Sequence, residues 1–212
     1  MHLTKEEIAA KNRIERLNII NSITGIKPGN LIGSFSEKYG ANLAVFSSVV
    51  HLGSHPALLG FILRPEGEVP RNTFENIAQT GYYTINHIHK EIIQKAHFTS
   101  AKFERHISEF EACQLTEEYL DNFPAPYVKE STIKLGMRFI ESIPIKANNT
   151  KMVVGQIEHL YFPDEAKSPE GYVDMEKSGS VGIGGLNSYY QLSQLATFPF
   201  ARPEELPNFK KK

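Results

Sequence analysis

The sequence predicts a mainly β fold, a small barrel or sandwich with helical decoration. Short runs rich in β-branched and aromatic residues recur along most of the chain and end at Gly, Pro or Asn clusters. Helical periodicity is confined to a few short segments, without the regular strand and helix alternation of a doubly wound sheet. The 212 residues are 41% hydrophobic and 22% charged, so the chain can bury a core and is neither disordered nor fibrous.

The first quarter of the chain predicts helix and then strands. Thr4 and Glu7 have capping-box spacing, and apolar residues recur at helical intervals up to Gly25, so one or two short helices open the chain. Two extended runs, Leu31–Phe35 and Asn42–Val50, flank a polar turn and predict a hairpin. A third extended run covers residues 58–63 and ends in a turn that contains Pro and Gly.

The middle of the chain mixes helix and strand. Asn72 with Glu75 predicts the start of a short helix that Gly81 ends, and Tyr82–Ile88 follows as a strand. Residues 91–116 lack strand alternation and are expected to be helix and loop. Residues 128–145 and 152–162 predict two strands around a polar turn at 147–150.

The last fifty residues are expected to be irregular. Residues 163–186 are rich in Gly and polar residues, and a helix is predicted around Tyr189–Leu195. We therefore divide one domain of residues 1–212 into a helical segment (1–25), a barrel core (28–162) and a C-terminal extension (163–212).

Composition excludes several classes of function. The net charge of −1 lacks the positive excess that binding to nucleic acid requires. The single cysteine, Cys113, rules out an intramolecular disulfide, a Cys-rich zinc site and a redox dithiol, so any redox chemistry needs a borrowed cofactor. The acidic N-terminus and the lack of a long apolar run predict a cytoplasmic protein without a membrane span.

Two segments are candidate binding sites. Ser47 and Ser48 interrupt a nearly continuous apolar run, and their small hydroxyl side chains suit a phosphate or the polar edge of a flat ring. Hydrogen bonding of these serines to backbone at a bulge is the alternative. Arg71, Asn72 and Thr73 place a cation and hydroxyl at a helix start, which suits an anion, although Asn72 also serves as an ordinary N-cap and a surface Arg is usually solvated.

Other motifs carry no site. The Gly-rich run at residues 179–185 lacks the last glycine of a dinucleotide fingerprint and does not follow an apolar strand, so a flexible loop or turn is expected. His51 with His55 and His87 with His89 lack the helix or the additional ligands of a metal site. No nucleophile elbow occurs, and Cys113 has no neighbouring cation, so a buried, inert thiol is expected.

Several blocks, in order, resemble the flavin reductase-like, FMN-binding split-barrel family. NLAVFSS at 42–48 and PALLGF at 56–61 are similar to two of its strands, and RNTFENIAQTGYYTIN at 71–86 is similar to its next helix and strand. Weaker blocks are SEFEA at 108–112, APYVKES at 125–131, VGQIEH at 154–159 and GGLNSYY at 184–190. Arg71-Asn72 replaces a commoner Lys-Asp, and Val45 stands where a Pro often precedes Phe46.

This resemblance implies a six-stranded split β-barrel that forms a homodimer and binds FMN, with FAD as the alternative flavin and NAD(P)H as a transient hydride donor. It implies cofactor contacts at Asn42, Phe46, Ser47, Ser48, Val49, Arg71, Asn72, Thr73, Thr99 and Ser100. The function expected is flavin reduction, with a monooxygenase as a possible partner. The alternatives are a flavin carrier or sensor without turnover and a structural dimer whose pocket has decayed.

Overall fold

Seven antiparallel strands form the main sheet of the computed structural model, which describes residues 1–65 and 72–209. Their order across the sheet is β3-β2-β6-β9-β10-β5-β4. The strands are β2 (Asn30–Ser36), β3 (Gly40–Phe46), β4 (Val50–Ser54), β5 (Ala57–Leu63), β6 (Tyr82–His87), β9 (Lys134–Ile145) and β10 (Thr150–Tyr161). These bounds confirm the predicted hairpin and the later strands at 58–63, 82–88 and 152–162, although the run 42–50 is divided between β3 and β4. The strand predicted over 128–145 is interrupted, because residues 129–133 are not strand and β9 begins at Lys134.

The two edge strands are consecutive in sequence, and this makes the sheet a barrel. β3 and β4 lie at opposite ends of the strand order, yet only residues 47–49 connect them. Because four residue steps reach about 14 Å at most, the two edges must lie close together. No β pairing joins β3 to β4 within the described residues, so the barrel stays open along this line. We call this opening between β3 and β4 the split.

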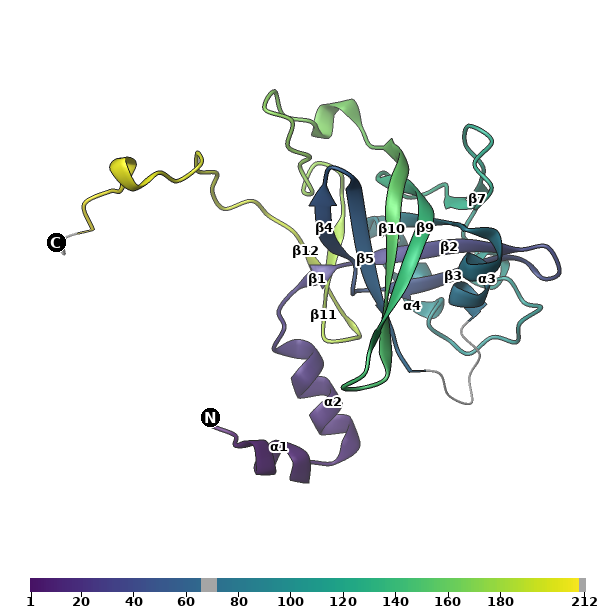
Figure 1. Ribbon diagram of the computed structural model, residues 1–212, viewed down its shortest axis with the longest axis horizontal. Coiled ribbons are helices and arrows are strands. Elements are labelled where there is room, and N and C mark those ends of the chain that lie inside the picture. The colour runs from purple at the N-terminus through teal and green to yellow at the C-terminus, as the bar shows by residue number, and fades with distance from the viewer. Residues whose placement is uncertain (66–71, 210–212) are drawn as a thin grey trace.

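The split barrel predicted from the resemblance is confirmed, with seven strands in the main sheet where six were expected. Figure 1 shows the strands in two groups, with β2 and β3 running across the direction of β4, β5, β9 and β10. Such crossing is what closing a twisted sheet on itself requires.

The barrel interior is filled by aromatic and branched side chains. Phe61 and Tyr83 are fully buried and meet edge to face, with ring centroids 5.7 Å apart, and Phe46 packs on Phe61. The hydroxyl of Tyr83 lies over Gly155, where any Cβ would collide with it. The packed interior contains Ile32, Leu63, Ile77, Ile85, Ile133, Leu135, Met137 and Val153.

Three helices cover β2 and β3. α3 (Asn72–Thr80) packs mainly on β2, while α4 (Ile93–Phe98) and α5 (Glu109–Ala112) pack on β3. The helix predicted to start at Asn72 is confirmed, and Gly81 ends it with a φ of +77°, in the left-handed region that favours glycine. A short 3-10 helix, Lys90–Ile92, precedes α4.

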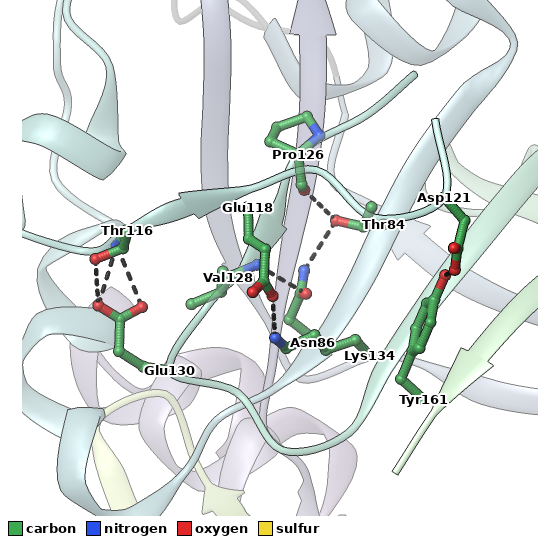
Figure 2. Close-up of polar contacts among 10 residues, drawn as sticks. All are labelled: Thr84, Asn86, Thr116, Glu118, Asp121, Pro126, Val128, Glu130, Lys134 and Tyr161. Atoms are coloured by element: carbon green, nitrogen blue, oxygen red, sulfur yellow. Dashed lines mark hydrogen bonds and ion pairs between the residues drawn. The ribbon is translucent and has the colours of Figure 1, made fainter. Parts of the chain in front are cut away.

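A two-stranded ribbon, β7 (Glu117–Glu118) with β8 (Tyr127–Val128), is attached to the sheet by buried polar contacts (Figure 2). Asn86 on β6 accepts a hydrogen bond from the Val128 N–H at 3.0 Å and donates one to Thr84 at 2.9 Å. Thr84 in turn donates to the Pro126 carbonyl at 2.6 Å. Because each of these groups is buried, each would be costly to leave unpaired.

The ends of the chain form a second, three-stranded sheet of β1 (Lys27–Pro28), β11 (Val181–Gly184) and β12 (Ser188–Gln191). The capping box of Thr4 and Glu7 is confirmed at α1 (Lys5–Ala10), which α2 (Arg13–Ser22) follows. Residues 163–180 include the 3-10 helix Asp164–Ala166 and otherwise lack helices and strands.

Two predictions about the C-terminal part are wrong. The Gly-rich run 179–185 is not a loop but contains the buried strand β11, whose glycines allow β1 and β12 to approach closely. At Gly182, a Cβ would collide with Ile26. The helix predicted at Tyr189–Leu195 is instead β12 followed by irregular chain, because pairing with β11 outweighs local helical spacing.

Residues 192–209 form an extended segment in which the short 3-10 helix Pro203–Glu205 is the only helix or strand (Figure 1). None of the helices within residues 1–65 and 72–209 has the length and hydropathy needed to cross a bilayer.

The fold predicts an acid-sensitive histidine. His87 hydrogen-bonds Ser180 at 3.3 Å, and burial lowers the pKa of His87 from 6.5 to about 4. The unfolded chain therefore binds a proton below pH 6.5 that the folded chain rejects, so stability falls as the pH drops through this window. We expect a loss of about 2 kcal/mol between pH 7.5 and pH 5.

Urea unfolding at several pH values measures this loss. His87→Gln should remove it, because glutamine keeps a hydrogen-bonding group without titrating. The exposed His106→Gln is the matched control and should leave the loss in place. An unchanged pH dependence in His87→Gln would contradict the assignment.

Candidate flavin site at the split

The outer edge of β3 offers backbone groups to the split. The Leu43 N–H points away from β2, because it donates to the Glu109 carboxylate at 2.9 Å. In an antiparallel pair, every second residue turns its N–H and C=O the same way, so those of Val45 also face away from β2. Within the described residues, the Val45 backbone has no partner on that side.

Asn42 ties β3 to the surrounding helices. Its side-chain oxygen accepts from the Ser34 and Thr73 hydroxyls at 3.2 and 3.1 Å, and its Nδ2 donates to Glu109 at 2.6 Å. The side-chain oxygen of Asn42 is therefore fully engaged within the protein, and its Nδ2 holds Glu109. Its part in a binding site, which the resemblance implied, is to position β3 and the start of α3.

Glu109 is the carboxylate at the centre of this cluster. Burial raises the pKa of the Glu109 carboxyl above its usual range, and the hydrogen bonds from Leu43 and Asn42 oppose that rise. Glu109 occupies the first residue of α5, so it also lies where a helix dipole favours a negative charge. The only sequence signal for this role is the block in which Glu109 lies.

Residues 46–49, where the chain crosses the split, differ in the contacts that their side chains make. The Ser48 hydroxyl donates to the Ile62 carbonyl at 3.2 Å and accepts from the Ile62 N–H at 3.1 Å. Ser48 therefore bonds to backbone, which is the alternative that the sequence left open for this residue. The Ser47 hydroxyl makes no such bond to any residue that the structure describes, and Ser47 is only half-buried. Phe46 and Val49 pack against the barrel interior.

A small polar pocket lies beside the start of α3. It is lined by Tyr39, Gly40, Ala41, Asn42, Asn72, Asn76, Arg105 and Ile107. The Oδ1 atoms of Asn72 and Asn76 and the Nε of Arg105 are buried there without a hydrogen-bond partner in the described part of the chain. Asn76 is only 2% exposed. Buried polar atoms are rarely left unpaired, so this pocket fits water or a polar ligand group.

Arg105 shapes one wall of the pocket. Its guanidinium pairs with Glu75 and lies 4.6 Å from the ring centroid of Tyr39. Tyr39, Asn76 and Arg105 were not among the residues expected from the sequence, because isolated polar residues in three separate segments form no motif. Arg71, the cation expected here, lies outside the described residues.

Thr99 and Ser100 are the remaining expected contacts. They follow α4, and their hydroxyls donate to the carbonyls of Ala96 and His97 at 2.8 and 2.7 Å. These hydroxyls cap the helix end, and Thr99 is buried. α4 packs on β3, so the two residues lie on the helical side of the split edge. Cys113 is a buried free thiol, and burial raises its pKa, as expected for an inert cysteine.

Comparison with known proteins decides the family. The flavin reductase like domain family matches residues 27–179, which include every strand of the barrel. The chain belongs to this family. Flavin reductase-type function and a flavin cofactor follow from that membership.

Solved structures of other proteins share the fold of this chain. A split-barrel protein from Shewanella frigidimarina NCIMB 400, proposed to be a flavin reductase, is 45% identical with a TM-score of 0.91, over 95% of this chain and 100% of that one. Nitrilotriacetate monooxygenase component B from Bacillus cereus is 15% identical, with a TM-score of 0.80 over 93% and 98%. The FMN-binding protein from Thermus thermophilus is 12% identical, with a TM-score of 0.68 over 84% and 93%.

The residues at the split fit a flavin. A flat ring needs backbone donors and acceptors along one edge, and the unpaired Val45 edge beside the small Ser47 provides them. A polar tail needs buried hydrogen-bonding groups, and the pocket at the start of α3 has them.

The Asn42 cluster yields a stability prediction. Asn42→Ala leaves the Ser34 and Thr73 hydroxyls and the Glu109 carboxylate short of partners, so we expect a loss of about 3 kcal/mol in urea unfolding. Asn42→Asp sets a second carboxylate against Glu109, so it should cost more at pH 8 than at pH 5, where one carboxyl takes up a proton. Asn18→Ala, on the exposed side of α2, is the control and should cost little. Equal losses from all three variants would contradict this role.

Proposed function

We propose that the chain is an FMN-binding oxidoreductase that transfers hydride from NADH or NADPH to flavin, giving NAD(P)⁺ and reduced flavin. The single observation that carries this proposal is the unpaired outer edge of β3 at Val45, next to Ser47. The polar pocket at the start of α3 lies at the other end of the same strand, where Gly40, Ala41 and Asn42 line it. No protein acid or base is needed for hydride transfer, which agrees with the lack of a catalytic dyad motif in the sequence.

Different residues would hold the ring and the phosphate of the flavin. Val45 backbone groups and the Ser47 hydroxyl would hold the polar edge of the ring, while Phe46 and Val49 anchor the crossing to the barrel interior. The start of α3, with Arg71, Asn72 and Thr73, would hold the phosphate. The Thr73 hydroxyl donates its hydrogen bond to Asn42, so Thr73 would contribute chiefly its backbone N–H to the phosphate site. When bound, the flavin supplies the hydride acceptor.

FMN is the flavin preferred over FAD in this proposal. The FMN-binding relative from T. thermophilus supports the same choice.

Absorption spectra test the cofactor first. The purified protein, mixed with FMN and desalted, should retain flavin, and it should then oxidise NADH or NADPH at a rate proportional to protein. Retained flavin without any such turnover would favour the carrier or sensor, and protein that binds no flavin in a titration would favour a structural role.

Substitutions test the phosphate end. Arg71→Ala with Thr73→Ala should weaken FMN affinity several-fold while riboflavin, which lacks the phosphate, loses little. Arg13→Ala, an exposed arginine on α2, serves as the control. Fluorescence titration with both flavins measures the difference, and an FMN affinity equal to that of the parent would rule out this phosphate site.

The remaining expectations stay predictions. A homodimer and a monooxygenase that receives the reduced flavin are proposed, the latter supported by the likeness to component B of a monooxygenase. A cytoplasmic location and the division of one domain at residues 25, 28 and 162 are likewise proposals.

A further inference from the structure

Glu109 is a buried carboxylate whose charge the described part of the chain leaves without a cation. It is 8% exposed, and it accepts hydrogen bonds from the Leu43 N–H at 2.9 Å and from Asn42 Nδ2 at 2.6 Å. The bond from Asn42 is shorter than the usual distance of about 2.9 Å, as expected when the acceptor carries a charge. Burial raises the pKa of Glu109, and these hydrogen bonds oppose the rise by favouring the ionised form. Buried carboxylates are normally paired with a cation, so this one is a candidate functional group.

The carboxylate lies on the same strand edge as the proposed flavin ring. Leu43 and Val45 both turn their N–H groups away from β2, and residues two apart on a strand are about 7 Å apart. Glu109 Oε2 is 2.9 Å from the Leu43 nitrogen, and an acceptor atom of a ring would keep a similar distance from the Val45 nitrogen. The carboxylate oxygen and that ring atom would therefore be neighbours in one row, about 7 Å apart.

A negative charge at this place distinguishes the two redox states of a flavin. A hydride carries two electrons and one proton, so a neutral ring that accepts it gains one negative charge. The ring atoms that accept from a backbone N–H share this charge, and Glu109 would repel it, whereas the oxidised ring is neutral. At about 7 Å, one unit charge shifts an equilibrium roughly tenfold when the effective dielectric constant lies between the values for protein and water.

We propose that the Glu109 carboxylate weakens the binding of reduced flavin relative to oxidised flavin and so lowers the reduction potential of the bound cofactor. A tenfold difference in relative affinity corresponds to about 30 mV for a two-electron couple. The bound flavin then gives up its electrons more readily than it would beside a neutral side chain. This inference rests on the proposed function, which places the ring at Val45, and it names a residue that sets the energetics of that same site.

Glu109→Gln tests the charge with little change in shape. Both hydrogen bonds end on Oε2, so the amide oxygen of a glutamine can accept them both. The ratio of the Kd for reduced FMN to the Kd for oxidised FMN should fall about tenfold, which equals a rise of about 30 mV in the potential. Anaerobic reduction of bound and free FMN against a redox dye measures this ratio.

Further variants separate the charge of Glu109 from its structural role. Glu109→Asp keeps the charge but shortens the side chain, so it should leave the ratio near the parent value even where both affinities fall. Ala112→Lys adds a cation at an exposed position one turn along α5, and it should lower the ratio by a smaller factor than Glu109→Gln. This variant decides the question if Glu109→Gln does not fold. Glu111→Gln removes an exposed charge from the same helix and is the matched control, with the parent ratio expected.

Riboflavin serves as a second ligand, because it lacks the phosphate that a carboxylate would also repel. The same fall in the ratio with riboflavin assigns the effect to the ring, and a fall seen with FMN alone would overturn the inference. A parent ratio in folded Glu109→Gln, or an equal fall in Glu109→Asp, would also overturn it while leaving flavin binding in place. Parent protein that binds neither form of FMN would overturn the proposed function together with this inference.

Discussion

The short connection between β3 and β4 is the constraint on which the rest of the structure depends. Residues 47–49 join strands at opposite ends of the seven-stranded order, so the sheet must curl until its edges nearly meet. Ser48 bridges the gap by bonding both backbone groups of Ile62 on β5. The place of the opening that remains is therefore set by chain length, and its β3 side presents the unpaired backbone of Val45.

An open barrel must protect its unpaired edges, and this one does so with a buried carboxylate. Glu109 accepts from the Leu43 N–H where a further strand would otherwise pair, which limits the edge available for aggregation. Asn42 connects that carboxylate to Ser34 and Thr73, so one side-chain cluster fixes α5, β2 and the start of α3 together. The Val45 edge stays open beside it, and this contrast separates the structural part of β3 from its binding part.

Sequence patterns predicted the elements whose formation depends on residues close together in the chain. The capping box at Thr4, the helix from Asn72 to Gly81 and the β9–β10 hairpin follow from spacing and turn residues alone. The Gly179–Gly185 run was misread because β11 pairs with β1, more than 150 residues earlier in the chain. Tyr189 was misread because β12 in turn pairs with β11. The same reason hides the candidate site: Asn76 and Arg105 meet only after α3 and the segment before α5 fold against β3.

The contact between Tyr83 and Gly155 limits how this chain can change over evolutionary time. The tyrosine hydroxyl fills the space that a Cβ at position 155 would need, so neither residue can vary alone in the direction of larger size. An alanine at 155 becomes tolerable only after position 83 has lost its hydroxyl and part of its ring volume. Position 83 on β6 and position 155 on β10 are thus expected to change together as the sequence evolves. The smaller residue at 83 should appear before the larger one at 155.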